Sequence, residues 1–230
     1  MMILALESSA TACSAALTRD GELVAQNWQN SGLTHSRTLL PMVDSLLKNS
    51  GQTLDGVDVI AVAAGPGSFT GIRIGVSAAK GLAFAADKPA VGVSTLAAMA
   101  RNVAWMDGLI VCAMDARRQQ VYNALFQAEN GRLTRLTPDR AISLEDLAAE
   151  IKADARPKII VGDGARLCYN DLSERGISCR MAPAHLVMQN AVSVALEAEE
   201  LAGAGQLLTA QELQPVYLRP AQAQRLRDRV

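Results

Sequence analysis

Residues 59–86, VIAVAAGPGSFTGIRIGVSAAKGLAFAA, hold the pattern that decides the fold. Val59 to Ala64 is a continuous apolar run, which is typical of a strand that is covered on both faces. A glycine-rich loop from Gly65 to Gly71 follows this run, and residues 71–86 are apolar enough to predict a buried helix. A covered strand that leads through a tight loop into a helix predicts an α/β fold.

The remainder of the first half extends this unit. Leu39 to Leu47 follow the spacing of an amphipathic helix, which Gly51 would end. Pro41 limits where that helix can begin, because proline is tolerated in the first turn and not later. The other predicted elements are strands at 3–6, 13–17, 22–25 and 90–93, a hairpin turn at Arg19-Asp20-Gly21, and a helix from Ser94 or Thr95.

The second half repeats the same order of elements. Strands are predicted at 109–114, 121–126, 133–136 and 159–161, a helix after the capping box Ser143-Leu-Glu-Asp146, and a long helix at 187–202. Two successive units of three strands, helix, strand and helix predict two similar lobes, each a mixed sheet flanked by helices, with a cleft between them. This is the actin-like fold of actin, sugar kinases and heat-shock ATPases. We expect an N-terminal lobe at 1–106 and a reduced C-terminal lobe at 107–230.

The composition excludes several classes of protein. Half of the 230 residues are hydrophobic but only 3% are aromatic, so Ala, Val, Leu and Ile must fill the cores. A net charge of −1 argues against a broad basic face for nucleic acid, so any RNA connection would run through a partner. The four cysteines are scattered with no Cys-x-x-Cys pair, so neither a metal cage nor a disulfide framework is expected. The N-terminal segment has no basic flank and Glu7 interrupts its apolar run, so a signal peptide is not expected. We expect a reduced cytoplasmic protein with no metal and no membrane contact.

The glycine-rich loop has two interpretations. Its backbone N–H groups could face an anion with the helix dipole behind them, or its glycines could serve a tight turn below a closely packed helix. The Rossmann fingerprint would need glycine in place of Thr70, and the P-loop would need Gly-Lys in place of Thr70 and Gly71. The residues of this candidate anion, nucleotide or structural loop are Gly65, Gly67, Ser68, Thr70, Gly71 and Arg73.

The helix after the loop carries small residues at four-residue spacing. Such a stripe lets another helix approach closely, or it packs internally on the sheet. This helix is apolar nearly all round, and the preceding amphipathic helix has additional apolar positions, so the two side by side predict a protein-binding face. The predicted contact residues are Leu39, Leu40, Val43, Leu47, Ile72, Gly75, Val76, Ala79 and Ala83.

Two further turns carry candidate polar residues. Glu7 and Ser9 lie between the first two strands, where actin-like ATPases place an acidic residue and phosphate-binding glycines. Here those glycines are missing. Asp115 and Arg117 open the second lobe, where actin-like enzymes place a metal- or phosphate-directed aspartate; the alternative is a solvated turn with a local ion pair. An actin-like ATPase or phosphotransferase is the alternative function that these residues support.

The two histidines and the C-terminal arginines are weaker candidates for a functional site. His35 and His185 are isolated, which leaves little material for a metal site or a catalytic triad, and a metallopeptidase ranks last among the alternatives. The C-terminal arginines could touch RNA phosphates or belong to a solvated end; they are Arg219, Arg225, Arg227 and Arg229.

Segments along nearly the whole chain resemble the TsaB (YeaZ) family. They are ILALESSATACSAAL, HSRTLLPMVDSLL, AGPGSFTGIRIGVSAAKGLAFA, GVSTLAAMA, MDARRQQVY and PVYLR. The resemblance implies an actin-like, non-catalytic paralogue of TsaD, the subunit that transfers threonylcarbamoyl to tRNA. Where TsaD has a metal-holding His pair, this chain has Thr95 and Met99, which cannot replace two imidazoles.

The resemblance also implies partners. The helices at about 35–49 and 71–86 would pair with TsaD, or with a second copy as a homodimer, and the pair would recruit the ATPase TsaE. No cofactor is expected, except ATP or ADP within the multi-subunit complex. On this interpretation, Gly75→Leu or Ala79→Arg should separate the complex and leave the monomer folded.

Overall fold

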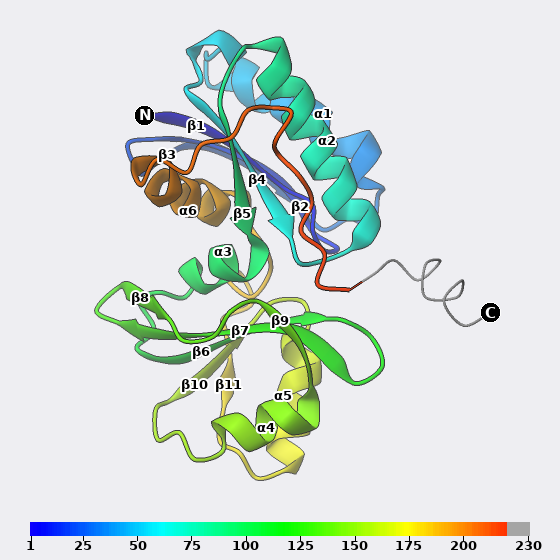
Figure 1. Cartoon of the computed structure of the whole chain (residues 1–230), viewed down its shortest axis with the longest axis vertical. Coiled ribbons are helices and arrows are strands. Elements are labelled where there is room, and N and C mark those ends of the chain that lie inside the picture. Colours follow the sequence, from blue (N-terminus) through cyan, green and yellow to red (C-terminus); the bar gives the residue numbers. More distant parts are fainter. Residues whose placement is uncertain (220–230) are drawn as a thin grey trace, which may run out of the picture.

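The computed structural model describes residues 1–219 as two lobes joined through a helix (Figure 1). The first sheet has the order β3-β2-β1-β4-β5. β1 pairs antiparallel with β2, with Met2 opposite Arg19, and parallel with β4, with Ile3 beside Val59. The strands are β1 Met2–Glu7, β2 Cys13–Arg19, β3 Glu22–Gln29, β4 Val59–Gly65 and β5 Ala90–Ser94.

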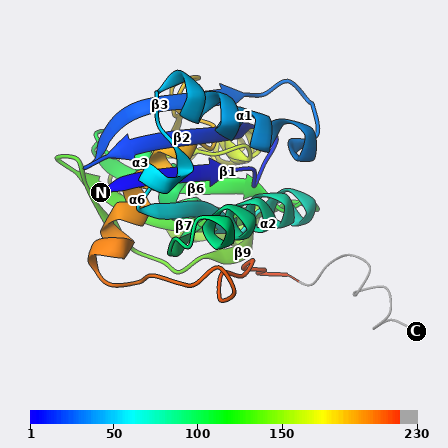
Figure 2. The same cartoon turned by 90° about the horizontal axis from the view of Figure 1, so that it is seen from above.

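Helices cover both faces of the first sheet. Because side chains alternate along a strand, Ile60 and Val62 of β4 face α1 and α2, whereas Ala61 and Ala63 face α6. Figure 2 shows these helices on opposite sides of the sheet. The helices are α1 His35–Asn49, α2 Phe69–Ala85 and α6 Ala191–Gly203, and a short 3-10 helix, η1, spans Leu54–Gly56. This two-sided cover explains the unbroken apolar run that the sequence shows in β4.

The second sheet has the order β11-β10-β6-β7-β8, and β9 also pairs with β7. One face packs on α4 and α5, and the other packs on α3. Residues 95–100 of α3 are all buried, since α3 also packs against α6. The elements are α3 Thr95–Arg101, β6 Gly108–Asp115, β7 Gln120–Glu129, β8 Arg132–Arg135, β9 Arg140–Ser143, α4 Leu144–Ile151, β10 Lys158–Val161, α5 Ala165–Glu174 and β11 Arg180–Met181.

The actin-like fold expected from the sequence is confirmed, but the predicted extent of the second lobe is wrong. Residues 107–219 do not form one lobe, because α6 returns to the first sheet and residues 208–216 also pack there. Leu208 then pairs with Ala90 of β5, and Leu213 is buried in the first core. Arg225, Arg227 and Arg229 lie outside the described residues.

Most predicted elements are found, with a few differences. The helix expected at 187–202 begins at Ala191. α1 begins at His35, so Pro41 lies in its second turn rather than the first, and it is exposed. The sequence did not predict β9, α5 or β11.

The small-residue stripe of α2 packs inside its own lobe, so its interpretation as a contact surface is wrong. A Cβ on Gly71 would lie 2.1 Å from the Ser8 carbonyl oxygen, and one on Gly75 would lie 2.4 Å from Ser8 Oγ. Ser8 Oγ also donates to the Gly71 carbonyl at 2.9 Å. The glycines therefore allow α2 to lie against the end of β1.

The same correction covers most of the predicted interface. Leu40 is exposed, and Leu47 is partly buried against the core. The buried residues are Leu39, Val43, Ile72, Gly75, Val76, Ala79 and Ala83. Gly75→Leu or Ala79→Arg would therefore damage the first lobe itself, and these variants cannot separate docking from folding.

We predict opposite stability effects for two glycine substitutions in α2. Gly71→Ala should lower the free energy of unfolding by about 1–3 kcal/mol, because its methyl group would overlap backbone atoms of Ser8. Gly81→Ala should raise it by about 0.5–1 kcal/mol, because Gly81 has open space around it and alanine favours the helix. Urea unfolding of both variants measures this difference; equal effects would show that α2 is not seated closely on β1.

Candidate functional site

A cavity of about 640 Å³ lies between the two lobes. Three turns and the end of the described chain form its wall: the β1–β2 turn, the β4–α2 loop, the β6–β7 turn and residues 216–219. The structure thus brings together several residues that the sequence singled out, namely Ser9, Gly67, Ser68, Asp115 and Arg117. The cavity occupies the cleft that two actin-like lobes were expected to enclose.

Glu7 lies beneath this cavity, at the end of β1. Its side chain is fully buried, and Oε1 accepts a hydrogen bond from the Ser9 backbone N–H at 2.5 Å. Burial, with a smaller contribution from the nearby Asp163 carboxylate, raises the pKa of Glu7 to about 7, although hydrogen bonds from Ser9 and Ser8 oppose both effects. Glu7 Oε2 has no hydrogen-bond partner among the described residues. The group is therefore more stable as the neutral acid than an exposed glutamate would be.

Sequence reasoning missed Asp163, which lines the same cavity. Burial raises the pKa of its carboxyl, while Gln189 Nε2 donates to Oδ1 at 2.9 Å and opposes that rise. The signal was present in Gly162-Asp163-Gly164, which follows the buried strand β10 much as the glycine-rich loop follows β4. Asp163 thus lines the cleft and Glu7 is buried beneath it, and both carboxyl groups have raised pKa values.

The glycine-rich loop uses its backbone donors internally. The Ser68 N–H donates to the Ser9 carbonyl at 2.7 Å, and the Gly71 N–H donates to Ser68 Oγ at 3.3 Å. Gly65 has φ +134°, and a Cβ there would lie 2.2 Å from the Val216 carbonyl oxygen. Since these N–H groups already have acceptors, the structural interpretation of the loop is favoured over an anion-binding one.

The β6–β7 turn is held by its own aspartate. Asp115 Oδ1 accepts from the Arg117 N–H at 2.7 Å, and Arg117 Nη1 lies 3.5 Å from Asp115 Oδ2. The Arg117 side chain is 86% exposed, so this ion pair contributes little stability. Of the two interpretations of this turn, the geometry supports the solvated turn with a local ion pair.

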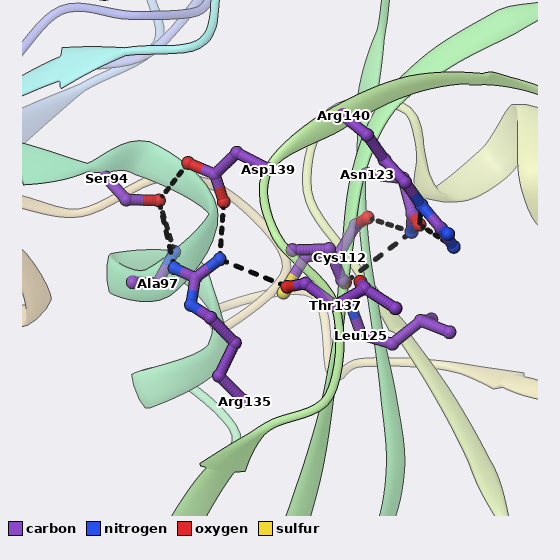
Figure 3. A network of polar contacts seen from close by, with 10 residues as sticks. Ser94, Ala97, Cys112, Asn123, Leu125, Arg135, Thr137, Asp139 and Arg140 are labelled. Atoms are coloured by element: carbon purple, nitrogen blue, oxygen red, sulfur yellow. Dashed lines mark hydrogen bonds and ion pairs between the residues drawn. The ribbon is translucent and has the colours of Figure 1, made fainter.

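A polar cluster ties the lobes together away from the cavity lining (Figure 3). Ser94 Oγ accepts from the Ala97 N–H at the start of α3 and donates to Asp139 Oδ2 at 2.6 Å. Arg135 Nη1 donates to Asp139 Oδ1 at 2.6 Å, and its guanidinium lies 4.7 Å from the centre of the Phe126 ring. The end of β5 is thus joined to the second lobe through charge-assisted bonds.

The positions that the resemblance aligned with a metal-holding pair lie in the core. Thr95 and Met99 are buried on α3, and Met99 packs against Gly162. His35 Nε2 donates to the Ala10 carbonyl at 2.7 Å and is part of the turn structure. Within residues 1–219, no group of three or more His, Cys, Asp or Glu side chains is arranged to hold a metal ion.

A second cavity, of about 620 Å³, opens between α1 and α2. Its lining is mainly apolar and includes Leu39, Leu40, Phe69 and Ile74, together with Thr70 and Arg73. Thr70 and Arg73, predicted as loop residues of an anion site, therefore face this groove and not the cleft. We define the docking face as the exposed residues that line this groove, Leu40, Phe69, Thr70, Arg73 and Ser77, together with Phe84. Phe84 follows Arg73 and Ser77 at helical spacing on α2 and lines a separate cavity with residues 207–212.

Comparison with known proteins agrees with this geometry. A family model described as TsaD, tRNA N6-adenosine threonylcarbamoyltransferase, matches residues 29–203. The tRNA threonylcarbamoyladenosine biosynthesis protein TsaB of Haemophilus influenzae is 32% identical over 95% of this chain and 94% of its own length. TsaB of Bacillus subtilis is 39% identical over 73% of each chain. The chain belongs to the TsaB (YeaZ) family. It is thereby placed in tRNA threonylcarbamoyladenosine biosynthesis.

Solved structures support the family and the fold. A Pseudomonas aeruginosa protein described as similar to peptidase YEAZ has a TM-score of 0.83 and 30% identity, covering 95% of this chain and 99% of its own. A second solved structure is the activator of 2-hydroxyisocaproyl-CoA dehydratase from Clostridium difficile with bound ADPNP. It has a TM-score of 0.51 and covers 94% of this chain and 99% of its own. At 14% identity, it shows a similar fold and nothing more. Among the described helices, none has the length and apolarity to span a membrane.

We predict that Glu7 makes the stability of this TsaB-family chain fall as pH rises. A carboxyl whose pKa is raised from 4.5 to about 7 by folding stabilises the fold fully below pH 4.5, and this contribution is lost as pH rises through 7. The loss should amount to roughly 3 kcal/mol, since each pH unit between the two pKa values contributes about 1.4 kcal/mol.

Urea unfolding of the native chain and of Glu7→Gln between pH 4.5 and 8 measures this effect. The substituted amide cannot ionise, so the variant should lose most of the fall, keeping only the part due to Asp163 and other groups. Parallel pH profiles for the two proteins would contradict the assignment to Glu7.

Proposed function

We propose that the chain is a non-catalytic docking subunit for the transferase TsaD. TsaD would transfer threonylcarbamoyl from threonylcarbamoyl-AMP to N6 of the tRNA adenosine beside the anticodon. The observation that carries the proposal is the apolar groove between α1 and α2, together with exposed apolar side chains on the same two helices. Leu40 is 50% exposed and Phe84 is 74% exposed. Large apolar side chains grouped on one face are typical of a protein-binding surface.

The non-catalytic role is supported by the residues at the two candidate centres. A threonine hydroxyl and a methionine thioether at positions 95 and 99 offer poor ligands in place of an imidazole pair. In the cleft, the Ser68 and Gly71 N–H groups that could bind phosphate already donate to the Ser9 carbonyl and to Ser68 Oγ. On this proposal the chain contributes a surface, and the reacting groups belong to TsaD.

The remaining partners follow from docking. The heterodimer would recruit TsaE, and tRNA would reach this chain through TsaD, in agreement with a net charge of −1. The same docking face would pair with a second copy when TsaD is absent, and ATP or ADP would bind only within the assembled complex. The fold places α1 and α2 side by side on one face of the first sheet, which leaves their outer sides free for such contacts.

An actin-like ATPase is the second candidate, and the cleft with its three carboxyl groups favours it. Glu7, Asp115 and Asp163 lie at or below the 640 Å³ cavity. This candidate requires saturable ATP binding by the isolated chain and loss of turnover in Asp115→Ala. Isothermal titration of the isolated chain with Mg-ATP separates the two functions, since the docking subunit should give no saturable heat.

We predict that Leu40→Asp and Phe84→Asp each weaken TsaD binding by at least roughly tenfold and reduce tRNA threonylcarbamoylation to a similar extent, because a carboxylate would be buried without a partner. Both side chains are exposed in the free chain, so its melting temperature should change little. Modification by TsaD, TsaE and tRNA, with each variant added back, provides the measurement.

Leu136→Asp is the matched control. Leu136 is 41% exposed on the second lobe, and its replacement should leave binding and modification as in the native protein. If the two docking-face variants behave like Leu136→Asp, the docking face is wrongly assigned.

A further inference from the structure

Residues 204–219 form a strap that runs from α6 across the first lobe (Figure 1). The Ala90 N–H donates to the Leu208 carbonyl at 2.7 Å, and the Leu208 N–H donates to the Ala90 carbonyl at 2.8 Å. The Leu213 side chain is fully buried in the first core. The Val216 N–H donates to the Ala64 carbonyl at 2.8 Å. Three separate anchors along the strap therefore fix its position on the first lobe.

Tyr217 joins the end of the strap to the docking face. Its ring centre lies 5.1 Å from that of Phe69, and Arg73 Nε donates to Tyr217 Oη at 2.8 Å. The Arg73 guanidinium also lies 3.9 Å from the centre of the Phe69 ring, in cation–π geometry. Tyr217 thus holds two docking-face residues, Phe69 and Arg73, in one arrangement.

Arg219, two residues further on, reaches the second lobe. Its Nη1 donates to the Ala116 carbonyl at 3.1 Å, and its Nη2 donates to Gln120 Oε1. The guanidinium also lies 5.8 Å from the centre of the Tyr122 ring. These acceptors belong to the β6–β7 turn and to β7, so the strap bridges the mouth of the interlobe cavity.

We propose that Arg219 is a positioning residue that closes a clamp between the lobes and, through Tyr217, fixes the docking face for its partner; this rests on the proposed function. Two lobes around a cleft can rotate relative to one another unless contacts oppose the motion. The Ser94–Asp139–Arg135 cluster provides one tie, and Arg219 provides a second among the residues that line the cavity. Without the Arg219 contacts, the end of the strap is free to move. The Tyr217 ring then no longer holds the Phe69 ring and the Arg73 guanidinium in place.

The first measurement is the distance between the lobes in the isolated chain. Spin labels at Asn49→Cys on α1 and Lys152→Cys after α4, in a Cys179→Ser background, report this distance by double electron–electron resonance; Cys13, Cys112 and Cys168 are buried. We expect one narrow distribution for the parent protein and a broader one for Arg219→Ala. Arg219→Lys should fall between them, because an ammonium does not reproduce the two-armed contact.

The second measurement is TsaD affinity by titration calorimetry. Arg219→Ala should weaken it roughly tenfold, within the range of coupling between sites. Gln120→Ala, on the second lobe, should also weaken TsaD binding. The double variant should lose less binding free energy than the sum of the losses in the two single variants. Arg175→Ala is the matched control, since it removes an arginine–Asp171 pair on the surface of the second lobe, and it should leave both measurements unchanged.

The outcomes separate the clamp from docking itself. An unchanged distance distribution in Arg219→Ala, or unchanged TsaD affinity, overturns the clamp. If Arg219→Ala weakens TsaD binding but Gln120→Ala does not, the clamp is also overturned, because Arg219 would then act by direct contact with the partner. If the unmutated chain does not bind TsaD, the proposed function itself fails.

Discussion

The close contact between α2 and the end of β1 is the constraint on which the other features depend. Ser8 fills the space that side chains at positions 71 and 75 would occupy, and it bonds the Gly71 carbonyl. This contact fixes the start of α2, and with it the loop below the cleft and the outer residues Phe69 and Arg73. One seating of a helix on a strand therefore sets the geometry of both the cleft and the docking face.

The cleft and the docking face use this scaffold differently. In the cleft, Glu7 is buried beneath the turns and Asp163 lines the cavity, both with raised pKa values. The Ser9 N–H donates to Glu7 and the Ser68 N–H donates to the Ser9 carbonyl, so hydrogen bonds within the protein order this part of the cleft. The docking face instead leaves large apolar side chains in contact with solvent. Water around such side chains is released when a partner covers them, and this provides a driving force for association.

The sequence was sufficient where local pattern decides structure. Continuous apolar runs identified the central strands, and Ser143 capped α4 as its capping box predicts. The buried residues of α5, Ala165, Cys168 and Leu172, do have helical spacing, but the helix was missed because this stripe is short and two of its three residues are small. The return of α6 and of Leu213 to the first lobe depends on non-local packing, which no local period reports. Four-residue spacing of small residues indicated close approach on α2 correctly, but it could not identify Ser8 as the neighbour. Asp163 was missed for the same reason, because its position beside the cleft depends on how the two lobes pack together.

Hydroxyl-radical footprinting of the chain with and without TsaD tests the central claim most directly, because it reads side-chain exposure without substitution. The account predicts that Phe69 and Phe84 of α2 become protected in the complex, while Trp105, which is 84% exposed on another part of the surface, remains as reactive as in the free chain. Protection of Trp105 with unchanged oxidation of Phe69 and Phe84 would contradict it.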